Sequence, residues 1–119
     1  MAIEKRSGGC HCGKVRYEVE IDLSQPVIEC NCSHCEIKGL LLSFVPREAV
    51  TMLKGEAELT EYRFNTEAIA HMSCKTCGVQ VFGQGKKKDG TQTSGINVRT
   101  LDSVDLSKVT RMPYDGKSR

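Results

Sequence analysis

The sequence predicts an all-β domain of short strands that is stabilised by metal. Three observations support this prediction: short apolar runs alternate with turn residues, there is no long amphipathic helix, and seven cysteines fall into three tight clusters. The core is thin, because 39% of the residues are hydrophobic and only 5% are aromatic, with no Trp. Small domains with few large apolar side chains in the core depend on cross-links such as metal ions or disulfides.

The first half of the chain supplies most of the expected strands. Residues 15–21 alternate apolar and polar side chains, which is typical of a half-buried strand. Pro46 ends an apolar run that indicates a buried strand, and a single helical turn is expected over residues 46–49. The extended segments expected in this half are 15–21, 27–30, 40–45, 51–54 and 60–64.

The second half is expected to be more irregular. One strand, over residues 68–72, leads into the last cysteine pair, and another, over residues 78–82, leads out of it. Residues 83–95 are polar and glycine-containing, which predicts a loop with a turn at Asp89-Gly90. A further strand is expected at 96–101, followed by a poorly ordered tail from Met112.

Length and charge limit the class of protein. A chain of 119 residues is expected to form a single domain over residues 1–119. The net charge of +2 is not that of a nucleic-acid-binding protein, so no nucleic-acid partner is expected. No apolar run approaches the roughly 20 residues that span a bilayer, so no membrane partner is expected.

Charged residues rather than an apolar run follow Met1, which predicts a cytoplasmic protein. Disulfides are rare in that compartment, and clustered cysteines there more often bind metal. The odd number of cysteines also argues against a disulfide framework, which stays the alternative.

The first and last clusters together contain four cysteines. Cys10 and Cys12 are in C-x-C spacing, and Cys74 and Cys77 are in C-x-x-C spacing, each pair followed by a glycine. Two thiolates on one tight turn can both reach a tetrahedral ion, and four close a structural zinc site. Such a site would tie the N-terminal strand to a segment more than sixty residues later in the chain.

The middle cluster places Cys30, Cys32 and Cys35 on one short loop. Three thiolates leave one coordination position open, which is typical of a catalytic zinc. Such a centre carries a net negative charge and should acidify water weakly, whereas a thiol in the fourth position can be held as a thiolate. The cluster therefore favours thiol chemistry over hydrolysis. The alternatives are a second structural site completed by a histidine such as His34, an empty site, or an iron–sulfur cluster.

Taken in order with their flanking residues, the clusters resemble those of the glutathione-dependent formaldehyde-activating enzyme family, also called the centromere protein V-like family. The matching stretches are residues 9–17, 30–35 and 71–79. The resemblance implies a β-tent fold with two zinc ions per chain. One zinc would be structural, bound by Cys10, Cys12, Cys74 and Cys77. The other would be labile and catalytic, bound by Cys30, Cys32 and Cys35.

The resemblance also implies an activity and its partners. The family adds glutathione to formaldehyde, giving S-hydroxymethylglutathione, and is classed as a carbon–sulfur lyase. By this analogy the partners are a small thiol and a small aldehyde, and the thiol engages the zinc of the middle cluster before attacking the aldehyde carbon.

Polar side chains beside the middle cluster are candidates for substrate contact. Asn31 and Ser33 offer hydrogen-bond donors, and His34 could gate or protonate a bound substrate, the alternative being a loop histidine without such a role. His71 is expected at a strand position and His11 in a solvent-facing turn.

The sequence departs from the family pattern in three places. Glu36 stands where relatives often carry a basic residue, residues 83–88 replace a turn that is common in relatives, and a Trp common near the C-terminus is missing. These departures leave a second hypothesis open: a non-enzymatic zinc module that binds a thiol metabolite or a macromolecular partner.

Overall fold

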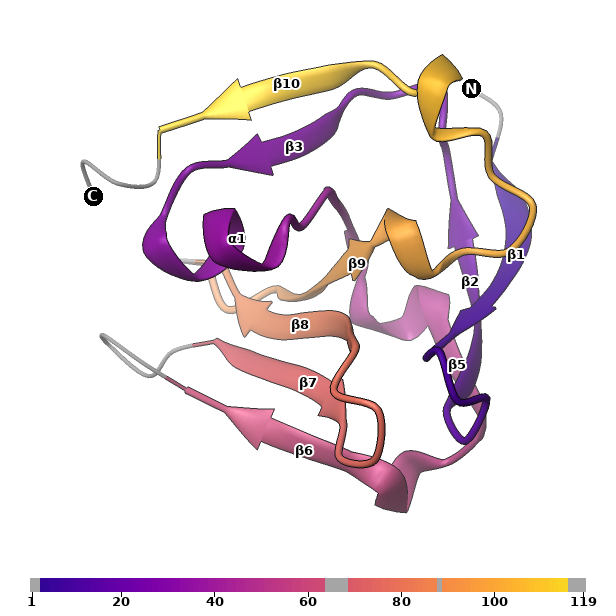
Figure 1. The fold of residues 1–119 in the computed structure, drawn as a ribbon. Coiled ribbons are helices and arrows are strands. Elements are labelled where there is room, and N and C mark those ends of the chain that lie inside the picture. The colour runs from indigo at the N-terminus through magenta and orange to yellow at the C-terminus, as the bar shows by residue number, and fades with distance from the viewer. Residues whose placement is uncertain (1–2, 64–68, 88, 116–119) are drawn as a thin grey trace.

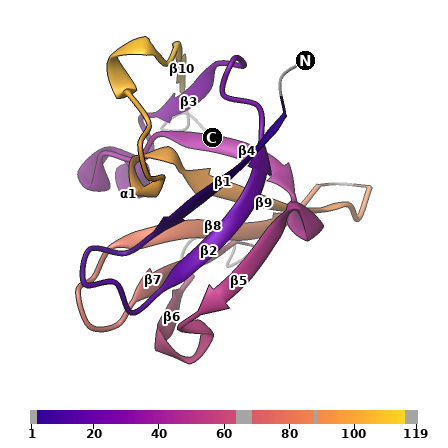
Figure 2. The ribbon, with the colours of Figure 1, turned by 90° about the vertical axis from the view of Figure 1, so that its right-hand side faces the viewer.

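The computed structural model describes residues 3–63, 69–87 and 89–115, which form two β-sheets. The smaller sheet has three antiparallel strands: β1 (Glu4–Gly9), β2 (Arg16–Ile21) and β5 (Val50–Lys54), in the order β1-β2-β5. Figure 2 shows this sheet facing the viewer. The strand predicted at 15–21 is its central member, since β2 pairs with both neighbours.

The larger sheet has seven strands in the order β10-β3-β4-β9-β8-β7-β6 (Figure 1). Neighbouring strands are antiparallel, except that β10 runs parallel to β3. The strands are β3 (Val27–Cys30), β4 (Leu42–Pro46), β6 (Leu59–Tyr62), β7 (Ala70–Cys74), β8 (Gln80–Lys86), β9 (Gln92–Asn97) and β10 (Arg111–Tyr114). The prediction of an all-β protein is confirmed.

Within residues 3–63, 69–87 and 89–115, helical structure is confined to five short pieces. One is an α-helix, α1 (Ser33–Lys38), and four are 3₁₀ turns: Arg47–Ala49, Glu56–Glu58, Val98–Thr100 and Leu106–Lys108. The first 3₁₀ turn confirms the helical turn predicted at 46–49. In the described residues, no helix is long and apolar enough to cross a membrane.

The helix α1 corrects the prediction that the middle cysteines share a loop. Cys32 is its N-cap, where its sulfur accepts a hydrogen bond from the Cys35 backbone N–H, and Gly39 ends it in the left-handed region at φ 66°. Both ends of a six-residue helix are therefore capped, which satisfies backbone groups that so short a helix would otherwise expose.

The core lies between the two sheets. Tyr17 of β2 packs edge-to-face on Phe82 of β8, with ring centroids 5.7 Å apart and planes at 89°. The buried Tyr17 hydroxyl lies 2.7 Å from Thr100 Oγ1, which itself donates to the Asn97 carbonyl. Val15, Val19 and Ile21 are also buried here, so the alternating pattern of residues 15–21 correctly predicted the inward face.

Residues 83–87 and 89–95, the described part of the predicted loop, do not form a loop. They belong to a hairpin in which β8 pairs with β9 from Phe82–Ile96 to Lys86–Gln92. The predicted turn at Asp89-Gly90 is confirmed, with Gly90 at φ 90°. Gly95 has the low strand propensity that suggested a loop, but a Cβ there would lie 2.9 Å from the Phe44 ring. The glycine thus allows close packing inside a strand.

Other predictions need smaller corrections. The expected strand at 96–101 ends at Asn97, since residues 98–100 form a 3₁₀ turn. The tail is ordered at 111–114, because it pairs with β3. Phe44, expected to be buried, is 58% exposed. Residues 64 and 68, at the ends of predicted strands, and residues 116–119 lie outside the described residues.

Candidate metal centres

The first candidate centre is the four-cysteine cluster. The sulfur atoms of Cys10, Cys12, Cys74 and Cys77 all lie within 4.8 Å of one another. Cys10 and Cys12 come from the connection between β1 and β2, Cys74 ends β7, and Cys77 lies in the turn before β8. The cluster thus joins one strand connection of each sheet, as the sequence predicted.

Sulfur–sulfur distances in this cluster fit a zinc ion. Cys12 Sγ lies 3.6 Å from Cys10 Sγ and 3.7 Å from Cys74 Sγ. A tetrahedral ion with Zn–S bonds of about 2.3 Å places its sulfurs about 3.8 Å apart, whereas a disulfide needs about 2.0 Å. These two distances fit ligands of one metal ion and are too long for disulfide bonds.

Backbone groups around the cluster favour thiolates. The Val15 N–H donates to Cys10 Sγ at 3.4 Å. The N–H groups of Val79 and Cys12 lower the pKa of Cys77 to about 6, because a donor stabilises the charged sulfur. The two turns are alike, since Gly13 and Gly78 both have φ 81°. Glycine is favoured at both positions, because a positive φ is strained for residues that carry a Cβ.

The second candidate centre is the three-cysteine cluster, Cys30, Cys32 and Cys35. Its sulfur atoms also lie within 4.8 Å of one another. Cys30 ends β3, and the other two lie at the start of α1. No fourth His, Cys, Asp or Glu of the described residues belongs to this group, His34 included. The cluster could therefore hold a metal with one position left open.

The pKa values of Cys35 and Cys32 in this cluster are shifted in opposite directions. Burial raises the pKa of the Cys35 thiol, which is only 8% exposed. Burial acts in the same direction on Cys32, but hydrogen bonds from the Cys35 backbone N–H, the Cys35 and Cys30 thiols and the His34 backbone N–H together outweigh it and lower the Cys32 pKa. The N–H of Cys32 in turn donates to Cys30 Sγ at 3.4 Å. A bound cation would favour the thiolate form of all three sulfurs.

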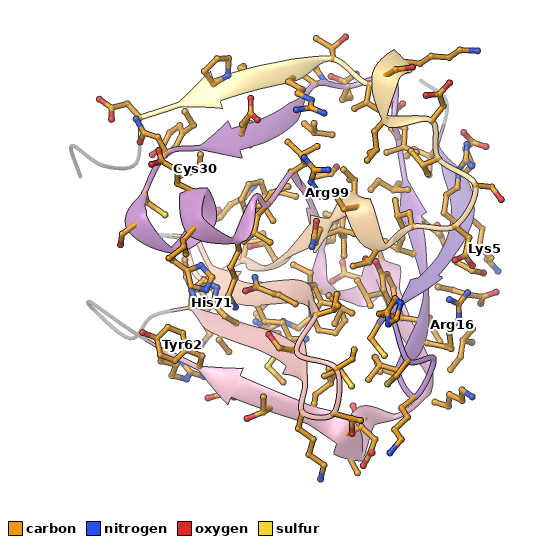
Figure 3. The ribbon with its side chains drawn as sticks, viewed as in Figure 1. Lys5, Arg16, Cys30, Tyr62, His71 and Arg99 are labelled. Carbon is orange, nitrogen blue, oxygen red and sulfur yellow. The ribbon has the colours of Figure 1, made fainter. Side chains whose placement is uncertain are left out.

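His34 and His71 form a ring cluster on the other side of α1. Their ring centroids are 4.0 Å apart, and Tyr62 stacks on His34 at 5.9 Å. Figure 3 shows Cys30 on one side of α1 and His71 and Tyr62 on the other. Burial, followed by the charges of His71 and Lys38, lowers the pKa of His34 to about 4, so the ring is neutral at pH 7.

This cluster changes the interpretation of His34 and agrees with the strand position expected for His71. His34 is a buried helix residue rather than a loop histidine, and it faces β7 rather than open solvent. His71 lies on a strand as expected, and its pKa is also lowered, first by burial. The exposed turn position predicted for His11 is confirmed.

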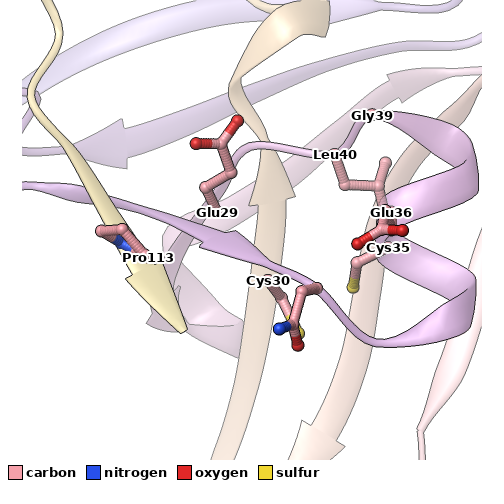
Figure 4. Close-up of a pocket in the computed structure, with 8 residues that line it drawn as sticks. Glu29, Cys30, Cys35, Glu36, Gly39, Leu40 and Pro113 are labelled. Atoms are coloured by element: carbon pink, nitrogen blue, oxygen red, sulfur yellow. The ribbon is translucent and has the colours of Figure 1, made fainter. Parts of the chain in front are cut away.

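A cavity of about 320 Å³ lies beside the three-cysteine cluster (Figure 4). Its lining comes from β3, α1, the residues that follow α1, and β10: Glu29, Cys30, Asn31, Cys35, Glu36, Gly39, Leu40 and Pro113. Asn31 donates to Asp115 through Nδ2 at 3.2 Å, which orients its side chain at the cavity edge. Ser33 is exposed and is not part of the lining.

A second cavity, of about 300 Å³, includes Lys38, Gln80 and Arg99 in its lining. Lys38 Nζ donates to Gln80 Oε1 at 3.0 Å, and Arg99 Nε donates to the Gly39 carbonyl at 2.8 Å. Sequence reasoning missed Pro113 as a neighbour of the middle cluster and Arg99 as a hydrogen-bond partner of Gly39, the residue that ends α1. No local pattern reveals them, because β9 and β10 approach this region only through sheet pairing.

Comparison with known proteins identifies the family of this chain. The sequence model of the glutathione-dependent formaldehyde-activating enzymes matches residues 5–114. The chain belongs to this family. A Penicillium rubens protein that carries the family's name is 37% identical over 86 residues, covering 66% of this chain but 43% of that protein. The chain thus matches less than half the length of that relative.

A solved structure shows the same fold. The crystal structure of a Rhodobacter sphaeroides protein, a structural genomics target, superposes with a TM-score of 0.78 at 29% sequence identity. The match covers 90% of this chain and 97% of that one. The resemblance inferred from the three cysteine clusters is therefore confirmed, and the cysteine clusters of this family member could hold zinc.

Proposed function

We propose that this chain adds a thiol, glutathione or a similar compound, to formaldehyde or another small aldehyde, as a carbon–sulfur lyase. The observation that supports this proposal is the pairing of a closed four-cysteine cluster with an open three-cysteine cluster that borders a cavity. Family membership supports the same reaction. The proposal includes two zinc ions per chain, a structural one on the four cysteines and a labile one on the three.

In the proposed reaction the thiol sulfur forms a bond to the aldehyde carbon. The carbon–oxygen π bond breaks, and the proton released by the thiol ends on the new hydroxyl group. Zinc held by Cys30, Cys32 and Cys35 would supply a thiophilic cation that favours the thiolate form of the substrate. The reverse reaction releases the aldehyde from the adduct.

The protein's own residues would hold the two reactants together. The cavity beside Cys30 and Cys35 is large enough for a small thiol and the aldehyde, and proximity alone is a large source of rate. Asn31, oriented by Asp115, is proposed to contact the substrate at the cavity edge. Ser33 is proposed as a further contact. His34, buried against His71 on the other side of α1, is proposed to act on the substrate only by holding α1 in position.

Adduct formation tests this proposal. Zinc-loaded protein is mixed with glutathione and formaldehyde, and S-hydroxymethylglutathione is followed by NMR exchange against the spontaneous reaction. We expect acceleration by the wild type and its loss in Cys30→Ser, with Glu20→Gln, an exposed position on β2, as the control that keeps it. A wild-type rate equal to buffer, with zinc bound in both clusters, would favour the non-enzymatic binding module instead.

A further inference from the structure

The second cavity, of about 300 Å³, has cationic and uncharged polar side chains in its lining. Lys38 of α1 and Arg99 of the 98–100 turn are exposed at its surface. Gln80 of β8 and Asn97 of β9 are buried in its wall, at 4% and 6% exposed. In the described part of the chain, no Asp or Glu lines this cavity. Its lining therefore favours a negatively charged ligand.

Hydrogen bonds fix the wall of this cavity and leave cationic donors available. The Asn97 side chain donates through Nδ2 to the Gln80 carbonyl at 2.9 Å and accepts through Oδ1 from the Arg99 N–H at 3.2 Å. The bond from Arg99 Nε to the Gly39 carbonyl uses one of five guanidinium donors, and the bond from Lys38 Nζ to Gln80 uses one of three ammonium donors. Among the described residues, neither cation forms a salt bridge. Both can therefore bind an anionic ligand.

This cavity meets the one beside the three-cysteine cluster at the end of α1. Leu40 lines both cavities, and Gly39, the partner of Arg99, lines the first. Burial lowers the pKa of Lys38 and the charge of Cys35 opposes this shift, so these two groups are within electrostatic reach. Residues three apart on a helix are about 5–6 Å apart, whereas an extended tripeptide spans about 10 Å. A thiol of that size can place its sulfur at Cys35 and a carboxylate beside Lys38.

We propose that the second cavity binds a carboxylate of the thiol substrate, which Lys38 and Arg99 hold while the sulfur lies at the three cysteines. The inference rests on the proposed function, because that function assigns the sulfur to this cluster. Arg99 supplies planar N–H donors that match a carboxylate, and Lys38 supplies a second positive charge. The two residues touch neither the sulfur nor the aldehyde, so they determine specificity rather than catalyse the reaction. They select carboxylate-bearing thiols over neutral thiols of the same skeleton.

Two thiols that differ only in their carboxylates test the inference. Glutathione and its diethyl ester share the same sulfur and amine, but the ester lacks both negative charges. Their Kd values for zinc-loaded protein are measured by titration calorimetry at low ionic strength. Hydrogen bonds to a charged group change Kd by about tenfold or more, so we expect glutathione to bind at least about tenfold more tightly than the ester.

Variants separate the charge of the cavity from the size of the ethyl groups. The double variant Lys38→Gln with Arg99→Gln should remove most of the preference, whereas a steric effect of the ethyl groups would persist in it. The matched control is Lys5→Gln with Lys54→Gln, exposed positions on β1 and β5, which removes the same charge and should keep the preference. Zinc content and circular dichroism establish that each variant is folded. If the double variant does not fold, Lys38→Gln alone should weaken glutathione binding without changing that of the ester.

Inorganic phosphate, titrated alone, distinguishes a carboxylate of the thiol from a free anion. Phosphate binding that is tighter than glutathione binding and is lost in the double variant would assign the cavity to a free anion and overturn the inference.

The remaining outcomes separate this inference from the proposed function. A preference for glutathione that the double variant abolishes and the control keeps supports the inference. Equal binding of the two thiols, or a preference that the double variant keeps, overturns the inference, and accelerated adduct formation by the same protein leaves the proposed function intact. A preference that depends on Lys38 and Arg99, without any acceleration of adduct formation, supports the carboxylate site and overturns the proposed function.

Discussion

The variant Cys12→Ser tests whether the four-cysteine cluster stabilises the fold through a metal. Cys12 is the one exposed member of that cluster, whereas Cys10 and Cys74 are buried. Replacing an exposed sulfur by oxygen costs almost nothing in core packing, and exposed substitutions usually change stability by less than about 0.5 kcal/mol. A larger loss must therefore come from ligation.

The expected loss follows from the energy of a structural zinc. Such a site contributes about 10–16 kcal/mol, so one of four ligands accounts for about 3 kcal/mol. A domain has a total stability of about 5–15 kcal/mol, and a loss of this size would remove a large part of it. Cys30→Ser, in the other cluster, is the matched control and should cost less than about 1 kcal/mol, because it leaves all four structural ligands in place.

Urea unfolding at a fixed free zinc concentration measures both variants, and the same experiment with excess chelator removes the metal contribution. We expect Cys12→Ser to be less stable than the wild type in zinc and equal to it in chelator. If Cys12→Ser stays within about 0.5 kcal/mol of the wild type in zinc, the cluster does not stabilise the fold as a metal site.

Three further predictions concern single residues. Burial raises the pKa of Tyr17 to about 12. The stabilisation by its neutral hydroxyl should therefore be complete below about pH 10, and the free energy of unfolding should fall by about 3 kcal/mol as the pH rises to about 12. Urea unfolding measured against pH should show this fall in the wild type but not in Tyr17→Phe. Gly78→Ala should cost about 1–2 kcal/mol, because a Cβ has open space there but φ is 81°; an unchanged melting temperature would contradict this. His71→Ala removes the ring whose centroid lies 4.0 Å from that of His34. Zinc binding at the three cysteines, measured by chelator competition, should weaken by up to about tenfold. His71→Phe should restore it.

The cysteine clusters could be predicted from the sequence because metal-binding turns are local. The spacings of Cys10-Cys12 and Cys74-Cys77 fix each pair of sulfurs on one turn, and a tetrahedral ion needs two such pairs. The alternating residues 15–21 were likewise sufficient to predict β2 and its buried face.

Other features depend on contacts that are distant in the sequence. β10 is ordered because it pairs with β3, more than eighty residues earlier in the chain. The hairpin of β8 and β9 forms although Gly83, Gly85 and Gly95 disfavour strands, since partners on both sides satisfy its backbone. The pairing of β10 with β3 brings Pro113 to the cavity beside Cys30 and Cys35, whereas Glu29 and Glu36 flank these cysteines in the sequence itself.

The helix α1 is a different case, because local signals for it were present. Ser33 and Glu36 have the spacing of a capping box, and Gly39 supplies the usual C-terminal residue. The same residues carry the cysteine spacing, which predicts a loop of metal ligands instead of a helix. In the structure the N-cap is Cys32 rather than Ser33, so a residue of the three-cysteine cluster also starts the helix.

Four cysteines are proposed to hold a metal for folding, and three to hold a second metal for chemistry. Zinc content per chain, measured by mass spectrometry before and after a mild chelator, tests it most directly when the fold is followed by circular dichroism. We predict two zinc ions per chain, with one removed by the chelator while the β-structure is kept. A single zinc per chain, or the loss of both together with the fold, would contradict the claim.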